Sequence, residues 1–162
     1  MPLLQMSSDQ RHFNSLIWQV PSWGIAIAAG VVIAAREAGQ KPSVWRFPAK
    51  YAQTAVLAFG FFLLAALTIA LYKCRVFQAA TMPENLPKPP VNVPPSANRY
   101  LQGAMCLTTG CVAGLAGAQL MAYEGYIAWG GVVGLVAWVV LEILNKKVVK
   151  QIDSQRTAAR DL

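Results

Sequence analysis

Four stretches of this chain contain no lysine or arginine and are long enough to cross a lipid bilayer. They are residues 16–35, 52–72, 100–121 and 126–144. A spanning helix needs about 20 apolar residues, because each residue rises ~1.5 Å and the hydrocarbon layer is ~30 Å thick. The four stretches make up about half of the 162 residues. We therefore predict an all-α integral membrane protein, a bundle of four transmembrane helices.

The connecting segments predict two antiparallel hairpins. The spans of the first hairpin, residues 16–77, are separated by about 15 residues, and those of the second, residues 100–145, by only four. The linker between the hairpins, residues 78–99, holds six of the ten prolines. Proline fixes φ and lacks an amide donor, which excludes a regular helix here. We expect a Pro-rich spacer, with a docking strip for a partner protein as the alternative.

Basic residues predict the orientation in the membrane. If both termini and the whole segment between the second and third spans share one side, that side holds ten of the fourteen lysines and arginines, Lys73 and Arg75 included. The other four lie in the first loop, which weakens the bias. The positive-inside rule assigns the richer side to the cytoplasm. We therefore expect a cytoplasmic N-terminal tail, residues 1–15, and a basic amphipathic C-terminal tail, residues 146–162. A bacterial inner membrane is the default location.

The net charge of +7 does not indicate nucleic acid as a partner, because the basic residues flank apolar spans. In that position they favour orientation and contact with anionic lipid headgroups. Lys146, Lys147 and Lys150 directly follow the fourth span. We expect these three lysines to contact headgroups or a cytosolic or membrane protein partner.

Small residues recur every three or four positions within the spans. Such a face lets another helix approach closely, which replaces the hydrophobic drive that lipid cannot supply. The predicted packing positions are Gly103, Cys106, Gly110, Gly114 and Gly117 in the third span and Gly130 and Gly134 in the fourth. The first span adds Ala26, Gly30 and Ala34. These faces join helices either within one bundle or between copies, and their number favours a homo-oligomer.

Glu142 is the only ionisable residue within a predicted span. An intramembrane carboxylate is a candidate for ion or proton passage. With Thr108 and Gln119 on the third span, it could form part of a pore or polar relay. The alternative is a structural ion pair at the interface with Lys146, which follows in the favourable i+4 position.

The sequence gives no indication of an enzyme. The single histidine, His12, lies in the N-terminal tail, and the seven acidic residues are scattered. We therefore expect no catalytic residue, cofactor or metal site. The leading hypothesis is a non-enzymatic membrane protein that self-associates, as a channel-like or membrane-perturbing effector oligomer. The alternative is an accessory or scaffold subunit that anchors a larger membrane complex or a cytosolic partner. A lipid-modifying membrane enzyme is the third.

Overall fold

The computed structural model describes residues 8–40, 48–81 and 97–160, and apart from short turns they are all α-helical. The four helices are α1 (Ser8–Gln40), α2 (Ala49–Thr81), α3 (Ala97–Met121) and α4 (Gly125–Arg160). Part of the first loop and residues 82–96 of the predicted Pro-rich linker lie outside the described residues.

Each helix contains a segment that is long and apolar enough to cross a membrane, which confirms the prediction of four such helices. Large apolar side chains point outward along them: Phe62 is 68% exposed, Ile25 67% and Trp129 64%. A soluble protein rarely leaves so much contiguous apolar surface in water. Lipid is the solvent that fits this surface, as expected of an integral membrane protein.

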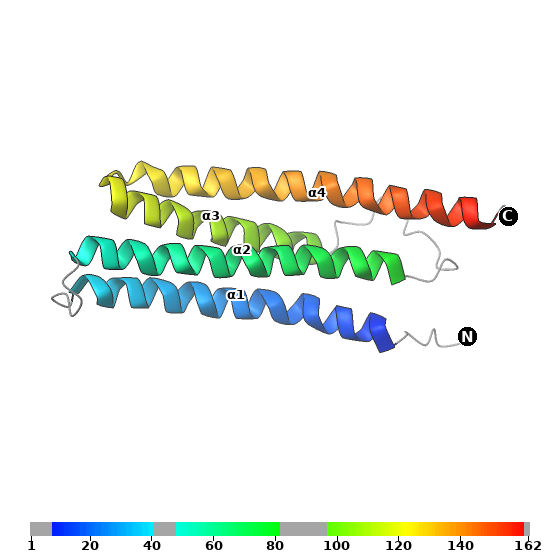
Figure 1. Ribbon diagram of the computed structural model, residues 1–162, viewed down its shortest axis with the longest axis horizontal. Helices are drawn as coiled ribbons and strands as arrows, with labels where there is room; N and C mark the ends of the chain where they lie inside the picture. Colours follow the sequence, from blue (N-terminus) through cyan, green and yellow to red (C-terminus); the bar gives the residue numbers. More distant parts are fainter. Residues whose placement is uncertain (1–7, 41–47, 82–96, 161–162) are drawn as a thin grey trace.

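The helices form a row in chain order, and successive helices run in opposite directions (Figure 1). The most extensive contacts are those of α3 with α4, of α1 with α2 and of α2 with α3, whereas α1 touches α3 and α2 touches α4 only slightly. Within the described part of the chain, α1 and α4 do not touch. The row therefore differs from a closed four-helix bundle, and each outer helix has one uncovered side. The start of α1 and the end of α4 lie at the same end of the row, which we call the terminal end.

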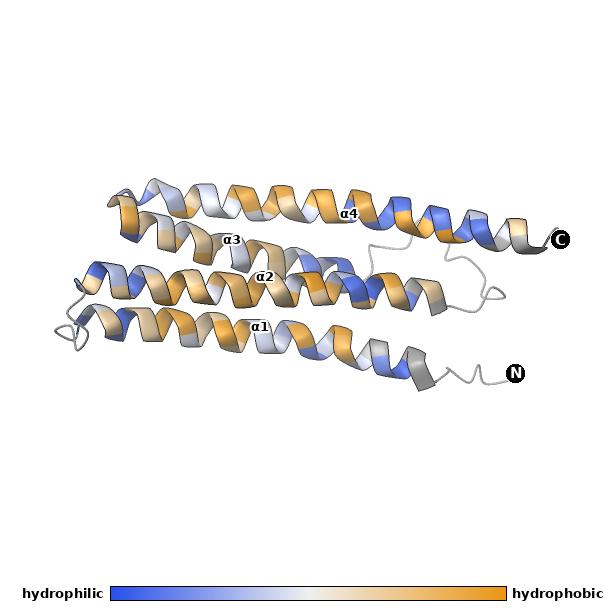
Figure 2. Cartoon of the chain, viewed as in Figure 1, coloured by the Kyte–Doolittle hydropathy of each residue, from blue (hydrophilic) through white to orange (hydrophobic). Residues whose placement is uncertain are grey.

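The outer helices are longer than a bilayer requires. The 33 residues of α1 and the 36 of α4 correspond to about 50 and 54 Å. Their excess length carries polar residues, and the C-terminal part of α4 is mainly hydrophilic (Figure 2). The helix runs without a break through the predicted C-terminal tail to Arg160, and α1 already begins within the predicted N-terminal tail.

The core lies where α1, α2 and α3 meet. Ile17, Leu64 and Leu71 are fully buried there, with Met105 of α3 only 2% exposed. Gln102 is also fully buried, although its amide is polar. A buried amide requires hydrogen-bond partners. Its Oε1 accepts from Arg75, which belongs to the polar site described below, whereas its Nε2 has no partner among the described residues.

The α3–α4 connection is a tight turn, as its three-residue length indicates. Ala122 adopts a positive φ of 55°, which reverses the chain directly after Met121. The amide of Tyr126 donates to the carbonyl of Tyr123 at 3.3 Å, and the amide of Ile127 donates to that of Glu124 at 3.1 Å. These bonds start α4 and set its register against α3.

Candidate functional site

Charged and amide side chains from three helices meet inside the terminal end of the row. Nη1 of Arg75 on α2 donates to Oε1 of Glu142 on α4 at 2.7 Å, and also to Oε1 of Gln102 on α3. Nε of Arg99, in the first turn of α3, donates to Oε2 of Glu142 at 2.9 Å. We call Arg75, Arg99, Gln102 and Glu142 the ionic cluster.

Most of the ionic cluster is withdrawn from solvent. The side chains of Arg75 and Glu142 are 7% and 11% exposed, whereas that of Arg99 is 34% exposed. Both carboxylate oxygens of Glu142 accept a charged hydrogen bond, which is the condition under which a buried ion pair is well compensated. The cluster therefore connects α2, α3 and α4 through one carboxylate.

The partners of Glu142 differ from the sequence-based alternative of a pair with Lys146. The reason is that α2 continues to Thr81, so Arg75 lies within the helix and turns toward α4 instead of leaving the membrane. The planar arginine fork suits a carboxylate better than a lysine ammonium does. An indication was present in the sequence: in helices of alternating direction, Arg75, Arg99 and Glu142 all lie at the same end.

A second polar contact lies deeper in the row. The hydroxyl oxygens of Thr68 on α2 and Thr109 on α3 are 3.2 Å apart and buried. Each hydroxyl also lies within hydrogen-bond distance of its own helix, Thr68 with the carbonyl of Leu64 at 2.8 Å and Thr109 with that of Met105 at 2.7 Å. The two hydroxyls have two protons for three contacts, and two of these contacts are with carbonyls of their own helices. The hydrogen bond between α2 and α3 is therefore weak compared with the bonds of the ionic cluster.

A cavity of about 390 Å³ lies beside the ionic cluster. Most of the polar side chains around it are basic. Its lining comprises Arg75, Arg99, Lys146, Lys150, Glu142, Asp153, Asn145 and Val149. Lys147, the third predicted headgroup lysine, is exposed on α4 and does not line the cavity. We call this space the basic cavity.

No protein-family model, no curated protein and no solved structure matches this chain. The function therefore has to be inferred from the chain's own geometry.

The three residues of the hypothetical pore or relay are not brought together. Thr108 is half-buried, and its hydroxyl donates to the carbonyl of Ala104 in its own helix at 2.9 Å. Gln119 is exposed near the opposite end of α3, 17 residues from Gln102 of the ionic cluster, or about 26 Å along the helix. The described part of the chain offers no continuous polar path from Glu142 through Thr108 to Gln119.

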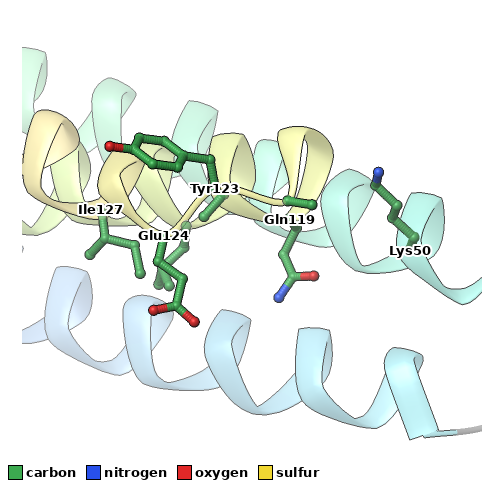
Figure 3. Close-up of a pocket in the computed structure, with 8 residues that line it drawn as sticks. Lys50, Gln119, Tyr123, Glu124 and Ile127 are labelled. Atoms are coloured by element: carbon green, nitrogen blue, oxygen red, sulfur yellow. The ribbon is translucent and has the colours of Figure 1, made fainter.

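Gln119 instead lines a second cavity of about 510 Å³ at the α3–α4 turn. Lys50 and Glu124 bring opposite charges to its lining. Figure 3 shows the side chains of Gln119 and Glu124 directed to the same side of the turn, whereas Tyr123 is directed away. This cavity is at the other end of the row from the ionic cluster.

The predicted packing glycines of α3 and α4 face each other within one chain. A Cβ atom added to Gly110 would lie 2.9 Å from the backbone nitrogen of Gly134 and still closer to the carbonyl of Gly130. One added to Gly114 would lie 2.9 Å from Cα of Ile127. The backbones of α3 and α4 are in direct contact at these positions, so the glycines form part of the interface between the two helices.

The remaining packing residues in α3 meet α4 less uniformly. The carbonyl of Cys106 would lie 2.5 Å from a Cβ added to Gly134. A Cβ added to Gly103 would lie 3.0 Å from the indole of Trp138, whereas one added to Gly117 would lie at an ordinary 3.5 Å from Tyr126. Gly117 is therefore the one position among them where a methyl group fits.

Within the described residues, no three histidine, cysteine, aspartate or glutamate side chains come together in a metal-binding arrangement. The arrangement of the ionic cluster suits a different task. Within the ionic cluster, two arginines bind the negative charge of Glu142. At the basic cavity, arginine and lysine side chains are available to bind a second negative charge.

Proposed function

We propose that this chain is a non-enzymatic membrane protein that assembles with copies of itself in the bilayer through the outer face of α1. That face is defined by Ala26, Gly30 and Ala34, which are spaced four residues apart and are all exposed. A stripe at this spacing lies along one side of a helix. Small residues on a lipid-facing stripe allow a second helix to approach within backbone distance.

Gly30 carries this proposal. Of the twelve glycines, it is the only one at which an added Cβ would meet no atom of the described residues within 4 Å. Gly110, Gly114, Gly130 and Gly134 already pack against each other's helices within the chain, so they are not free for a second copy, whereas the α1 face is exposed. The row supports this assignment further, because α1 has no fourth helix against its outer side.

A channel-like or membrane-perturbing activity would belong to the assembled form under this proposal. One chain gives its own polar residues no connected path in the described part, and its buried carboxylate is occupied by two arginines. In an oligomer, surfaces of several copies come together, and a channel-like path could then form between chains instead of within one chain.

The test is native mass spectrometry of the detergent-solubilised full-length protein, with Gly30→Leu as the variant. We expect the unmodified chain to form an oligomer and Gly30→Leu to shift it to the monomer, because leucine holds neighbouring helices apart. Ala137→Leu is the matched control, since Ala137 is exposed on the opposite outer helix, α4. A monomeric unmodified chain, or an oligomer unaffected by Gly30→Leu, would refute the proposal.

The second candidate function is an accessory or scaffold subunit, and the length of α4 favours it. From Lys146 to Arg160 the helix continues for 15 residues, or about 22 Å, beyond the fourth predicted span. This extension carries Lys146, Lys147 and Lys150 on a continuous helix that a partner could recognise. Truncation after Lys147, or deletion of residues 82–96, should then abolish co-purification of a soluble partner.

For either function we place the terminal end of the row in the cytoplasm, with the inner membrane of a bacterium as the host membrane. The distribution of basic residues supports this orientation, because ten of the fourteen belong to segments at that end.

A further inference from the structure

We propose that the basic cavity binds the phosphate of an anionic phospholipid headgroup. The cavity lies between the start of α3 and the C-terminal part of α4, and its lining holds four basic and two acidic side chains. Glu142 already has two arginine partners, so its charge is compensated within the ionic cluster. The other charged residues of the lining are Lys146, Lys150 and Asp153, so basic side chains still outnumber acidic ones around the cavity.

Free donors are present at the rim. Arg99 uses Nε for Glu142, and its two terminal nitrogens have no hydrogen bond to any described residue. Lys146 and Lys150 are exposed one turn apart on α4 and likewise form no ion pair within the described chain. Arginine and lysine in convergent positions are the groups that recognise phosphate oxygens.

The lining also includes one uncharged polar residue, Asn145. Oδ1 of Asn145 is buried and has no hydrogen-bond partner among the described residues. Buried polar atoms in folded proteins are nearly always hydrogen bonded. Because Oδ1 is shielded from solvent, a headgroup hydroxyl, such as that of phosphoglycerol, would reach it only after the Asn145 side chain turns toward the cavity.

The depth of the cavity favours a membrane lipid over a soluble phosphate. Lys146 follows Gly125 by 21 residues, or about 32 Å of helix, which matches one hydrocarbon thickness of ~30 Å. Before it on α4, Leu135 and Val139 are 47% and 52% exposed, and their spacing of eleven and seven residues from Lys146 puts them on the same face of the helix as the cavity. Aliphatic surface directly next to a basic cavity provides one place for acyl chains and one for the phosphate.

The experiment measures lipid binding to the full-length protein in detergent by native mass spectrometry. Dioleoylphosphatidylglycerol is the probe, dioleoylphosphatidylcholine the neutral comparison and inorganic phosphate the soluble competitor. We expect phosphatidylglycerol to bind more tightly than phosphatidylcholine. Lys150→Gln should weaken its binding about fivefold, the effect of removing one interfacial lysine.

Lys147→Gln is the matched control, because it removes the same charge three residues away from an exposed side chain outside the basic cavity. We expect it to leave binding nearly unchanged. Equal losses from Lys147→Gln and Lys150→Gln would overturn the proposal in favour of diffuse attraction. Equal binding of the two lipids, or displacement by inorganic phosphate at the lipid's own concentration, would also overturn it. Neither variant alters the α1 face, so the oligomer test remains separate.

Discussion

Arg75 and Glu142 are 67 residues apart in the chain, yet Nη1 of the arginine lies 2.7 Å from Oε1 of the glutamate. This pair joins α2 to α4, two helices that otherwise touch only slightly. Gln102 and Arg99 then attach α3 to the same two groups. A single buried pair therefore fixes the register of three helices at the terminal end.

The first prediction concerns the coupling between these two residues. Glu142→Met leaves Arg75 buried without an opposite charge, which should lower the free energy of unfolding by about 3–5 kcal/mol. Arg75→Met leaves Glu142 with the partly exposed Arg99 as its one remaining ion-pair partner, so its loss should be smaller. The double variant should recover much of this loss, because two methionines fill the space without a buried charge. Denaturant unfolding in detergent gives the free energy of unfolding of the unmodified protein, the two single variants and the double variant, which together form a double-mutant cycle.

Arg99→Met is the control for the first prediction. Its side chain is 34% exposed, so water screens its interaction with Glu142 and the loss should be smaller, about 1 kcal/mol or less. Strictly additive effects of the Arg75 and Glu142 substitutions would show that the pair is not coupled.

The second prediction compares two glycines on the same helix. Gly110→Ala should destabilise the protein by about 1–3 kcal/mol, because the new methyl group would meet the backbone of α4, which cannot move aside as a side chain can. Gly117→Ala should be tolerated or mildly stabilising, since its methyl group would lie 3.5 Å from Tyr126. Thermal unfolding in detergent distinguishes them, and similar melting temperatures would refute the packing described for α3 and α4.

The third prediction compares the contribution of the Thr68–Thr109 contact to stability with that of the ionic cluster. Thr109→Val keeps the shape of the side chain and removes a hydroxyl that shares its proton between Met105 and Thr68. Hydrogen bonds between membrane helices average about 0.6 kcal/mol in such comparisons, so we expect a loss of that order. The same denaturant measurement used for Glu142→Met should give a much smaller change. A loss as large as that of Glu142→Met would mean that the threonine pair holds α2 and α3 together.

The sequence was sufficient to predict the four apolar helices, because hydrocarbon requires long uninterrupted apolar segments whatever their neighbours. The spacing of small residues also suggested that glycines in the third and fourth spans allow helices to approach closely. It could not decide whether Gly110 and Gly134 meet each other or another copy, since the spacing along a helix is identical in both cases. Only the arrangement of helices shows that these two face each other and that Gly30 has no partner among the described residues.

The candidate site was less predictable for a related reason. Arg75 lies three residues beyond the second predicted span, so sequence reasoning treated it as an orientation charge at the membrane surface. Its burial depends on the continuation of α2 to Thr81 and on a carboxylate facing it from α4. A local sequence pattern contains neither fact, whereas the common depth of Arg75, Arg99 and Glu142 follows from the alternating helix directions.

The fourth prediction concerns the sidedness of the chain and uses three exposed positions, His12, Glu124 and Ser154. Each is changed to cysteine in a variant whose three native cysteines are replaced by alanine. His12 and Ser154 lie in the terminal parts of α1 and α4, whereas Glu124 lies at the opposite end of the row. A membrane-impermeant thiol reagent should label Glu124→Cys in intact cells, and the other two only after permeabilisation. Labelling of His12→Cys and Ser154→Cys from opposite sides would contradict an even number of crossings. Labelling of both from outside would reverse the orientation and place the basic cavity away from the cytoplasm.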